Sequence, residues 1–410
     1  MQLVESHIIS NNSRFYTECD SLCLKSKNLY NSCLYTIRQA YIKDKSNVLY
    51  SLHSIMKDSE QYKDLPAKVS STVLLMVQHN FKSYFKSLSE FYKSPSKFKS
   101  RPKLPKYLDT INGRFITSYT NQAISKKVFI KSNKILLSKT NIEIYTKITN
   151  FNQINCVRII PKIGHYVIEI VYTVSDTIKL NDNNRYISID LGVNNLATIT
   201  SNVNGIKPII INGKPLKSIN QYYNKKLAHY TSILKKHNNK KTSKRINKLH
   251  LKRKNKIDNY LHKSSKYINN LCKENEINTI IIGKNDSWKQ NVNIGKINNQ
   301  NFINIPHSRF ICMNTYKSEI SGINIITKDE SYTSKASFLD LDYIPNYGDK
   351  NISEFSGKRI KRGLYKTNKG NLINSDVNGS YNILRKVVPN AFANGIEGIG
   401  VYPYIITMLN

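Results

Sequence analysis

The sequence predicts a multidomain protein in which a helical region and a small antiparallel β-sheet or barrel precede a mixed α/β domain. The chain has 410 residues, which is enough for two to four domains of ordinary size. Apolar residues recur at helical spacing early in the chain, and short alternating runs follow them. From residue 185 onward buried strands alternate with helices, as in sheets whose parallel strands need helical crossovers.

Residues 14–92 are predicted to form the helical region. Apolar side chains recur there at intervals of three and four residues, and only Pro66 interrupts the pattern. The repeating positions include Val73, Val77, Phe81, Tyr84, Phe85 and Leu88. Three prolines at positions 95, 102 and 105 then break the pattern within Lys-rich sequence, which indicates an exposed linker.

Short alternating runs between residues 115 and 174 predict the strands of the small sheet or barrel. These runs lie at residues 128–130, 135–137 and 165–172.

Residues 185–200 are predicted to form a hairpin, with two strands joined by a turn at Gly192. Later elements follow in order: a long basic helix over 218–275 with a break near 237–241, a strand at 278–282, a helix at 302–322, a strand at 323–327, an irregular basic segment at 331–370, and a helix from near Asp376. Trp288, the single tryptophan, is expected to pack in the core, with stacking on a base as the alternative.

The charge of the chain points to nucleic acid. There are 63 Lys and Arg residues against 27 Asp and Glu, a formal net charge of +36. Cations of this kind neutralise phosphates and release condensed counterions, so a polyanion is the expected partner. The alternative is a solvated surface kept for solubility. Residues 217–266 alone hold 16 basic residues and one acid, and smaller basic patches lie at 82–106 and 350–369.

The sequence indicates an intracellular protein without a membrane partner. No apolar stretch approaches the roughly 20 residues that span a bilayer. The first residues lack the basic and apolar regions of a secretory signal. Six cysteines are scattered without a Cys-x-x-Cys pair, so a reducing compartment is expected.

Acids at strand and helix ends are the candidates for chemistry, since the sequence has no Walker loop, His-Glu-x-x-His or Gly-x-Ser-x-Gly motif. Asp190 ends an apolar strand, and Asp376 lies near a helix start that would face the same sheet edge. Three such acids would hold two divalent cations about 3.5 to 4 Å apart, which activate a water and stabilise a leaving oxygen. The structural alternatives are a turn role for Asp190 and an N-cap role for Asp376, which Ser375 or Asn374 would fill equally well.

Three motifs carry a family resemblance. They read Asp190-Leu191-Gly192-Val193-Asn194-Asn195-Leu196-Ala197, Tyr332-Thr333-Ser334-Lys335 and Asp376-Val377-Asn378-Gly379-Ser380-Tyr381-Asn382-Ile383. Together they resemble the TnpB family of transposon-encoded, RNA-guided nucleases, also called OrfB of insertion sequences. The Fanzor proteins and the type V CRISPR effectors are relatives of that family.

The resemblance implies an RNase H-like α/β nuclease domain of RuvC type, an N-terminal helical recognition domain and a small β-barrel wedge domain. It divides the chain into a wedge barrel at residues 1–13 and 108–180, a recognition domain at 14–107, a split nuclease domain at 181–330 and 371–390, a basic insert that binds target nucleic acid at 331–370, and a C-terminal tail at 391–410. The implied partners are a guide RNA from the transposon end and a target duplex DNA, which the single nuclease site cuts with Mg²⁺, two ions being expected.

The chain departs from the family at the middle acid. That acid normally follows the strand that here ends at Ile282, yet the next residue is Gly283, which has no side chain to bind a metal. Either the site is broken and the protein binds DNA without cutting it, or the acid has moved to Glu330 after the neighbouring strand. The RNase H-like fold that the resemblance implies places the strand before Glu330 beside the strand that ends at Ile282 and parallel to it. Both strands then end at one sheet edge about 4.8 Å apart, which favours Glu330. Asp329 is the nearest substitute, but alternation points its side chain the opposite way.

The chain also departs from the family in its zinc site. Typical members carry two cysteine pairs between the Thr-Ser motif and the last Asp, whereas residues 333–376 here contain no Cys or His. No structural zinc is therefore expected in this segment. A basic hairpin is expected to keep the target-strand contact without the metal.

The expected site residues follow from these motifs and patches. Asp190, Glu330 and Asp376 are the expected catalytic and metal-binding residues. Backbone contacts to nucleic acid are expected from the basic helix and the basic hairpin, at Lys244, Arg245, Lys248, Lys252, Arg253, Lys254, Lys256, Lys358, Arg359, Lys361 and Arg362.

The resemblance implies a transposon-associated, RNA-guided DNA endonuclease that hydrolyses phosphodiesters. Two alternatives stay open: a guided DNA-binding protein without cleavage, and a transposase that acts directly on DNA ends through the same acids. The expected location is the bacterial cytoplasm, or the nucleus or cytoplasm of a host if the gene is viral or eukaryotic.

Overall fold

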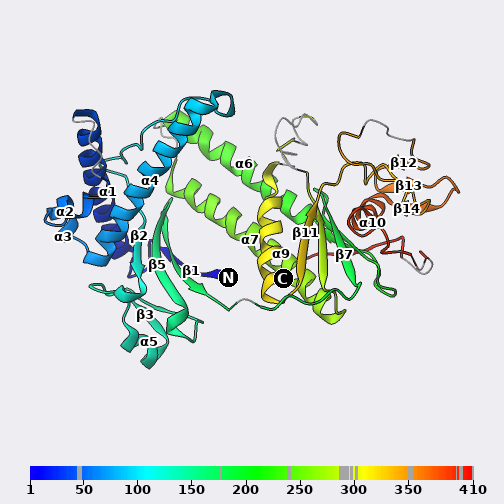
Figure 1. Ribbon diagram of the computed structural model, residues 1–410, viewed down its shortest axis with the longest axis horizontal. Helices are drawn as coiled ribbons and strands as arrows, with labels where there is room; N and C mark the ends of the chain where they lie inside the picture. The colour runs from blue at the N-terminus through cyan, green and yellow to red at the C-terminus, as the bar shows by residue number, and fades with distance from the viewer. Residues whose placement is uncertain are drawn as a thin grey trace. The chain divides into compact units, whose positions relative to one another are not determined.

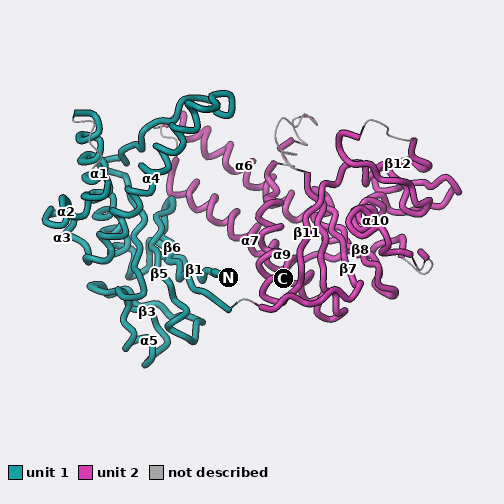
Figure 2. The backbone as a smooth tube through the Cα atoms, viewed as in Figure 1, with its two compact units in different colours: residues 1–175 teal, residues 176–410 magenta. Residues whose placement is uncertain are grey.

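The computed structural model forms two compact units, Met1–Ser175 and Asp176–Asn410, coloured separately in Figure 2. It describes residues 1–43, 49–175, 177–237, 242–285, 295, 299–300, 303–349, 354–393, 395–396 and 400–408. Trp288 lies outside the described residues, so its two interpretations are not decided. In the described part of the chain, no helix combines the length and apolar character needed to cross a membrane.

Two long helices form the helical layer of the first unit. They are α1 (Tyr16–Lys43) and α4 (Ala67–Lys93), with the short α2 (Leu52–Met56) and α3 (Glu60–Lys63) between them. α4 begins directly after Pro66, as expected for a residue that lacks a backbone N–H and fixes φ near a helix start. Val73, Val77 and Phe81 are buried, which confirms the predicted helical periodicity.

The strands of the first unit form an open antiparallel sheet. Its order is β1-β6-β5-β2, formed by β1 (Gln2–Ser10), β6 (His165–Thr173), β5 (Ile154–Lys162) and β2 (Thr117–Thr120). The expected closed barrel is therefore corrected to a sheet in which β1 and β2, among the described strands, are edges. Helices α1 and α4 pack against this sheet. α4 lies against the edge strand β2, where the Thr72 hydroxyl donates a hydrogen bond to the Ser118 carbonyl.

Residues 128–130, predicted to be a strand, lie instead in helix α5 (Lys126–Ser132). Ser125 caps its N-terminus by accepting a hydrogen bond from the Val128 N–H, and Asn133 ends it in the left-handed conformation at φ 52°. These local caps override the apolar run. A two-stranded sheet of β3 (Lys134–Leu136) and β4 (Glu143–Tyr145) follows the helix.

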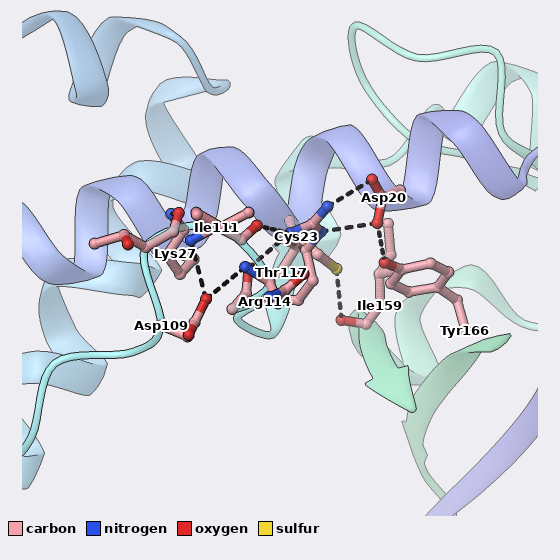
Figure 3. Close-up of polar contacts among 12 residues, drawn as sticks. Asp20, Cys23, Lys27, Asp109, Ile111, Arg114, Thr117, Ile159 and Tyr166 are labelled. Atoms are coloured by element: carbon pink, nitrogen blue, oxygen red, sulfur yellow. Dashed lines mark hydrogen bonds and ion pairs between the residues drawn. The ribbon is translucent and has the colours of Figure 1, made fainter. Parts of the chain in front are cut away.

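A polar cluster centred on Asp20 ties α1 to the sheet (Figure 3). Arg114 donates to both carboxylate oxygens of Asp20, at 2.8 and 2.9 Å, and the Tyr166 hydroxyl donates to Oδ1 at 2.5 Å. The hydrogen bonds from Arg114, aided by that from Tyr166, hold the pKa of Asp20 below its ordinary value although burial opposes them. The ionised carboxylate therefore stabilises the folded state.

Replacing Asp20 with asparagine is expected to destabilise the first unit by about 1 to 2 kcal/mol at neutral pH, because charge-assisted hydrogen bonds are lost. Since the folded-state pKa is lowered, this stabilisation is present above the ordinary pKa and is lost as pH falls through the lowered one. Thermal unfolding of wild type and Asp20→Asn from pH 7 to pH 3 should show the difference in their stability becoming smaller. The control is Asp58→Asn, whose pair with Lys63 spans 4.0 Å between exposed side chains and is expected to contribute nothing measurable.

The second unit is built on a six-stranded sheet. Its order is β11-β10-β7-β8-β9-β15, with β11 (Asn324–Lys328), β10 (Thr279–Gly283), β7 (Tyr186–Leu191), β8 (Asn195–Ser201), β9 (Ile209–Asn212) and β15 (Tyr404–Ile406). β7, β10 and β11 run parallel, so their carboxyl ends open on one edge. Part of residues 391–410, expected as a tail, supplies the edge strand β15, which pairs in parallel with β9.

Helices cover both faces of this sheet, as Figure 1 shows for α9 (His307–Ile320) and α10 (Ser375–Val387). Alternation along β10 explains the arrangement. Ile280 and Ile282 join a core with α7 (Lys244–Glu274) and α9, whereas Ile281 packs with Ile383 and Leu384 of α10. The basic stretch contains α6 (Lys214–His237) and α7. The break predicted near 237–241 falls on residues 238–241, which lie outside the described residues.

The basic insert contains a small antiparallel sheet. β12 (Lys358–Lys361) pairs with β13 (Leu364–Lys366), and β13 pairs with β14 (Leu372–Asn374), which leads directly into α10. The insert and the last acid are therefore joined by a single short strand.

Candidate active site

Asp190 is the next-to-last residue of β7, and its side chain lies on the face of the sheet that α10 covers. Its neighbours Ile189 and Leu191 point the other way, into the core with α7 and α9. α10 approaches Asp190 at Gly379, where a Cβ would stand only 3.1 Å from Asp190 Oδ2. Glycine at this position of the last motif therefore makes room for the carboxylate.

Asp376 lies in the first turn of α10, but it is not the residue that caps the helix. The side chain of Asn374 does so, since its Oδ1 accepts hydrogen bonds from the N–H groups of Asp376 and Val377, at 3.0 and 3.2 Å. The Asp376 carboxylate instead accepts a hydrogen bond of 2.6 Å from Asn195 Nδ2 and lies 3.7 Å from Arg359. The capping alternative for Asp376 is therefore wrong.

Gly283 ends β10 immediately beside Asp190. β10 and β7 pair in parallel with Ile282 opposite Ile189, so the next residue of each strand is also adjacent. Glu330, two residues beyond β11, extends over this glycine: its Oε2 lies 2.9 Å from where a Cβ of Gly283 would be. The Glu330 carboxylate thus occupies the space that a side chain at position 283 would fill.

Asp329 is held away from this position. Its Oδ1 accepts hydrogen bonds from the N–H and hydroxyl of Ser331, and it lies 3.6 Å from Lys386 Nζ. The two neighbouring acids therefore have different surroundings, as alternation along an extended segment predicts.

The charges of Glu330 and Asp376 act on the third acid, Asp190. Burial raises the pKa of Asp190 well above its ordinary value, and the charges of Glu330 and Asp376 raise it further. Burial, with a smaller effect of the Asp329 charge, raises the pKa of Glu330 to about 7. Asp190 is therefore the shared neighbour of the other two acids, and a nearby cation would relieve the repulsion among them.

The donor set fits a hard divalent cation. All three candidate side chains offer carboxylate oxygens, which Mg²⁺ prefers. The buried Glu330 Oε2 also has no hydrogen-bond partner within the described part of the chain. In the same described residues, however, no three His, Cys, Asp or Glu side chains converge closely enough to hold one ion. The acids are therefore gathered at one sheet edge without forming a closed cage.

A cavity of about 430 Å³ opens beside Asp190 and Asp376. Lys214, at the start of α6, and Arg359 and Arg362 of the basic hairpin also line it. Cations in such a cavity would attract a phosphodiester backbone toward the acids. Two of the four hairpin residues predicted to bind nucleic acid thus lie at the candidate active site, which the sequence did not indicate.

The other two hairpin residues, Lys358 and Lys361, are exposed in β12. Beneath them, two aspartates hold the insert together. Asp340 accepts hydrogen bonds from the hydroxyls of Ser337 and Ser356, and Asp342 accepts from the backbone N–H groups of the same two serines. Carboxylates thus bridge the chain in a segment where typical family members have cysteine pairs.

Two asparagines of the last motif position the Thr-Ser motif. Asn378 and Asn382, one helical turn apart, both donate to the Ala336 carbonyl, and Asn382 also donates to that of Thr333. Tyr381 stacks on Phe338 with ring centroids 4.4 Å apart. The spacing of these asparagines was visible in the sequence, but their partners were not.

The basic residues of α7 that were predicted to bind nucleic acid differ in their exposure to solvent. Six of the seven are exposed: Lys244, Arg245, Lys248, Lys252, Lys254 and Lys256. Arg253 instead turns toward α6, where it donates to Asn220 Oδ1 at 2.7 Å and lies 4.7 Å from the Tyr223 ring centroid. Its guanidinium joins the two helices, so the structure gives Arg253 a packing role in place of the exposed position expected for a phosphate contact.

Comparison with known proteins finds a family match in the middle of the chain. Residues 169–289 match the family model OrfB_IS605, described as a probable transposase. A search of curated proteins finds no match.

Among solved structures, the chain is similar to Cas12f1 in its complex with guide RNA and target DNA. The two share 18% identity, the match covers 90% of this chain and 82% of that chain, and the TM-score is 0.50. A Cas12f ternary complex gives 17% identity, coverages of 89% and 80%, and a TM-score of 0.35. C2c1 of Alicyclobacillus acidoterrestris with single-guide RNA gives 9% identity, coverages of 91% and 69%, and a TM-score of 0.36. Only the first of these similarities is high enough to support an argument about the fold.

The family resemblance identified from the motifs is thereby confirmed. Residues 169–289 match the OrfB_IS605 family of probable transposases, and the fold of the chain is similar to that of Cas12f1.

Proposed function

We propose that this protein is a transposon-associated, RNA-guided DNA endonuclease that cleaves duplex DNA by Mg²⁺-dependent hydrolysis. The observation that carries the proposal is the position of Glu330 Oε2 over Gly283, beside Asp190. This oxygen is buried without a hydrogen-bond partner in the described residues, which is costly for a carboxylate unless it binds a cation. The relocated acid therefore favours an active site over a broken one.

In this proposal Asp190, Glu330 and Asp376 would hold the two Mg²⁺ ions. Bound Mg²⁺ would activate a water and stabilise the leaving oxygen of the phosphodiester. Asn195 orients the Asp376 carboxylate through its 2.6 Å hydrogen bond. Arg359 and Arg362, which line the cavity, would draw the DNA backbone toward the acids.

The proposed partners are a guide RNA from the transposon end and a target duplex DNA. The net charge of +36 and the exposed cations of α7 support a polyanion partner. The similar Cas12f1 structure is a complex with guide RNA and target DNA, which makes the same pair of partners the first to test here.

Neutralising a lysine stripe on α7 is expected to weaken RNA binding through charge alone. Lys248, Lys252 and Lys256 are exposed and four residues apart, so they share one helix face. The affinity for RNA falls with salt, and the slope of log K against log[salt] reports the number of phosphates that the protein neutralises. The triple glutamine variant should reduce the size of this slope by about 0.7 for each lost phosphate contact, or about 2 in all. Filter binding with RNA from the flank of the gene, over a range of KCl concentrations, measures this slope.

Arg253→Gln is the matched control for the lysine stripe. Because Arg253 joins α7 to α6, its loss is expected to lower thermal stability while leaving the salt slope unchanged. A triple variant with the wild-type slope would show that this face does not contact RNA.

Reconstitution tests the function itself. The protein is combined with RNA transcribed from the flank of its own gene, and cleavage of matched and mismatched duplex DNA is compared in Mg²⁺ and in EDTA. Cleavage that needs matched sequence and Mg²⁺ is expected. Binding of matched DNA without cleavage would support the guided binder, and cleavage without RNA would support a transposase that acts directly on DNA.

A further inference from the structure

The loop that carries Glu330 is held from two sides. On one side is Asn285, two residues beyond the end of β10. Its Nδ2 donates to Glu330 Oε1 at 3.0 Å, and its Oδ1 accepts from the Glu330 backbone N–H at 3.3 Å. One amide thus fixes both the backbone and one carboxylate oxygen of the same residue.

On the other side is Lys386, in the last turn of α10. Its side chain is only 4% exposed, and its Nζ donates to the Ser331 carbonyl at 3.0 Å and lies 3.6 Å from Asp329 Oδ1. A buried ammonium that has lost its hydration depends on such partners. Lys386 therefore grips the residues immediately before and after Glu330.

These contacts fix the orientation of the Glu330 carboxylate while they engage only one of its two oxygens. Oε1 is held by Asn285, whereas Oε2 points at the space above Gly283 and has no hydrogen-bond partner in the described residues. A glutamate beyond the end of a strand has three rotatable side-chain torsions and a mobile backbone, so it would not keep this direction unaided.

We propose that Asn285 and Lys386 are positioning residues that orient the relocated Glu330 toward the metal site. Asn285 fixes the carboxylate and Lys386 fixes the loop. This inference rests on the proposed function, because it assigns Glu330 to metal binding. It adds two residues that lie outside the three motifs and whose role is specific to an acid at position 330.

Metal affinity tests the role of Asn285 without relying on cleavage. Mn²⁺ serves as the probe, and its binding to the full chain with guide RNA is measured by calorimetry. Asn285→Ala is expected to weaken Mn²⁺ binding about 10- to 100-fold, the usual effect of losing a residue that orients a ligand. Mg²⁺ half-saturation of cleavage should rise by a similar factor, with less change in the maximal rate.

Asn278→Ala is the matched control, at the opposite end of β10. Asn278 is buried and donates to the Asn181 carbonyl, so its loss tests general destabilisation of the strand. It is expected to lower thermal stability and leave Mn²⁺ affinity within about twofold of wild type.

The Lys386 variants separate charge from packing. Lys386→Met is expected to weaken Mn²⁺ binding, and Lys386→Arg to restore most of the affinity, since it keeps a donor toward Ser331. Wild-type affinity in both Asn285→Ala and Lys386→Met would overturn the inference, as would a wild-type protein that binds no Mn²⁺.

The inference and the proposed function fail in different ways. If wild type and its Asn285 variant differ in Mn²⁺ affinity but neither cuts matched DNA, positioning stands and the nuclease function falls. If wild type cuts and the Asn285 variant binds Mn²⁺ equally well, only the positioning role is lost.

Discussion

Replacing Asp190 with asparagine is expected to reduce Mg²⁺-dependent cleavage of guide-matched DNA by at least about a thousandfold. The charges of both other acids raise the pKa of Asp190, so its loss removes the carboxylate that lies near both of them in the proposed metal site. RNA binding and guide-dependent DNA binding should persist, because the exposed cations of α7 are unchanged. Single-turnover cleavage and filter binding on the same preparation measure the two properties.

Loss of folding does not account for this expected result. Burial and the neighbouring acids raise the pKa of Asp190, so its ionised form destabilises the metal-free fold at neutral pH. Asp190→Asn should therefore raise the melting temperature in EDTA at pH 8 while it abolishes cleavage.

Asp182→Asn is the matched control for Asp190. Asp182 precedes the other end of β7, where it accepts hydrogen bonds from the Tyr186 hydroxyl. It should keep cleavage near the wild-type level. Robust cleavage by Asp190→Asn would overturn the site assignment.

Glu330→Gln is expected to lower cleavage to the same extent as Asp190→Asn. Glutamine keeps the size of the side chain but removes the charge that a cation needs. Cleavage that survives this change would show that the acid has not moved to position 330 and would leave another residue as the ligand.

The same variant should change the pH dependence of stability. The pKa of Glu330 is about 7 in the folded protein against an ordinary 4.5, so metal-free wild type loses stability as pH rises from about 4.5 to about 7. The loss is no more than about 3.5 kcal/mol, from the size of the pKa shift. Glu330→Gln should lack this decline, and Mg²⁺ should stabilise wild type most above pH 7. Thermal melts across this pH range, with and without Mg²⁺, measure both effects.

Returning the acid to the strand end tests the relocation directly. A side chain on Gly283 would meet Ile383 Cδ1 at 2.5 Å and Glu330 Oε2 at 2.9 Å, so Gly283→Glu alone is expected to be poorly accommodated. Combining it with Glu330→Ala and Ile383→Val removes both obstacles. The triple variant should cleave at least about tenfold faster than Glu330→Ala, and its activity should no longer depend on Asn285.

The fold was largely predictable because its signals are local. Helical periodicity identified α4, and the basic stretch was predicted to be helical where α6 and α7 lie. The prediction failed at residues 128–130, where an apolar run of three is compatible with either a strand or a helix. There the caps at Ser125 and Asn133 decided the outcome.

The candidate site was predictable only in part. Asp190 and Asp376 stand in motifs, and Glu330 followed from the parallel order of two strands. Asn285 and Lys386 carry no local signal, because their importance comes from partners that are 45 and 55 residues away along the chain. The contact of Arg253 with α6 carries no local signal either, since its neighbours in the sequence are also cations.

The aspartate bridges of the insert change the conditions under which this region keeps its shape. Asp340 and Asp342 hold this segment through hydrogen bonds, and residues 333–376 offer no thiols to an oxidant. Acid is expected to weaken these bridges. Hydrogen bonds from Ser337, Asn368 and Ser356 hold the pKa of Asp340 below its ordinary value despite burial, so protonation at low pH would remove the charge that they stabilise. A chelator is therefore expected to remove the proposed Mg²⁺ while the hydrogen bonds of Asp340 and Asp342 keep the hairpin in place.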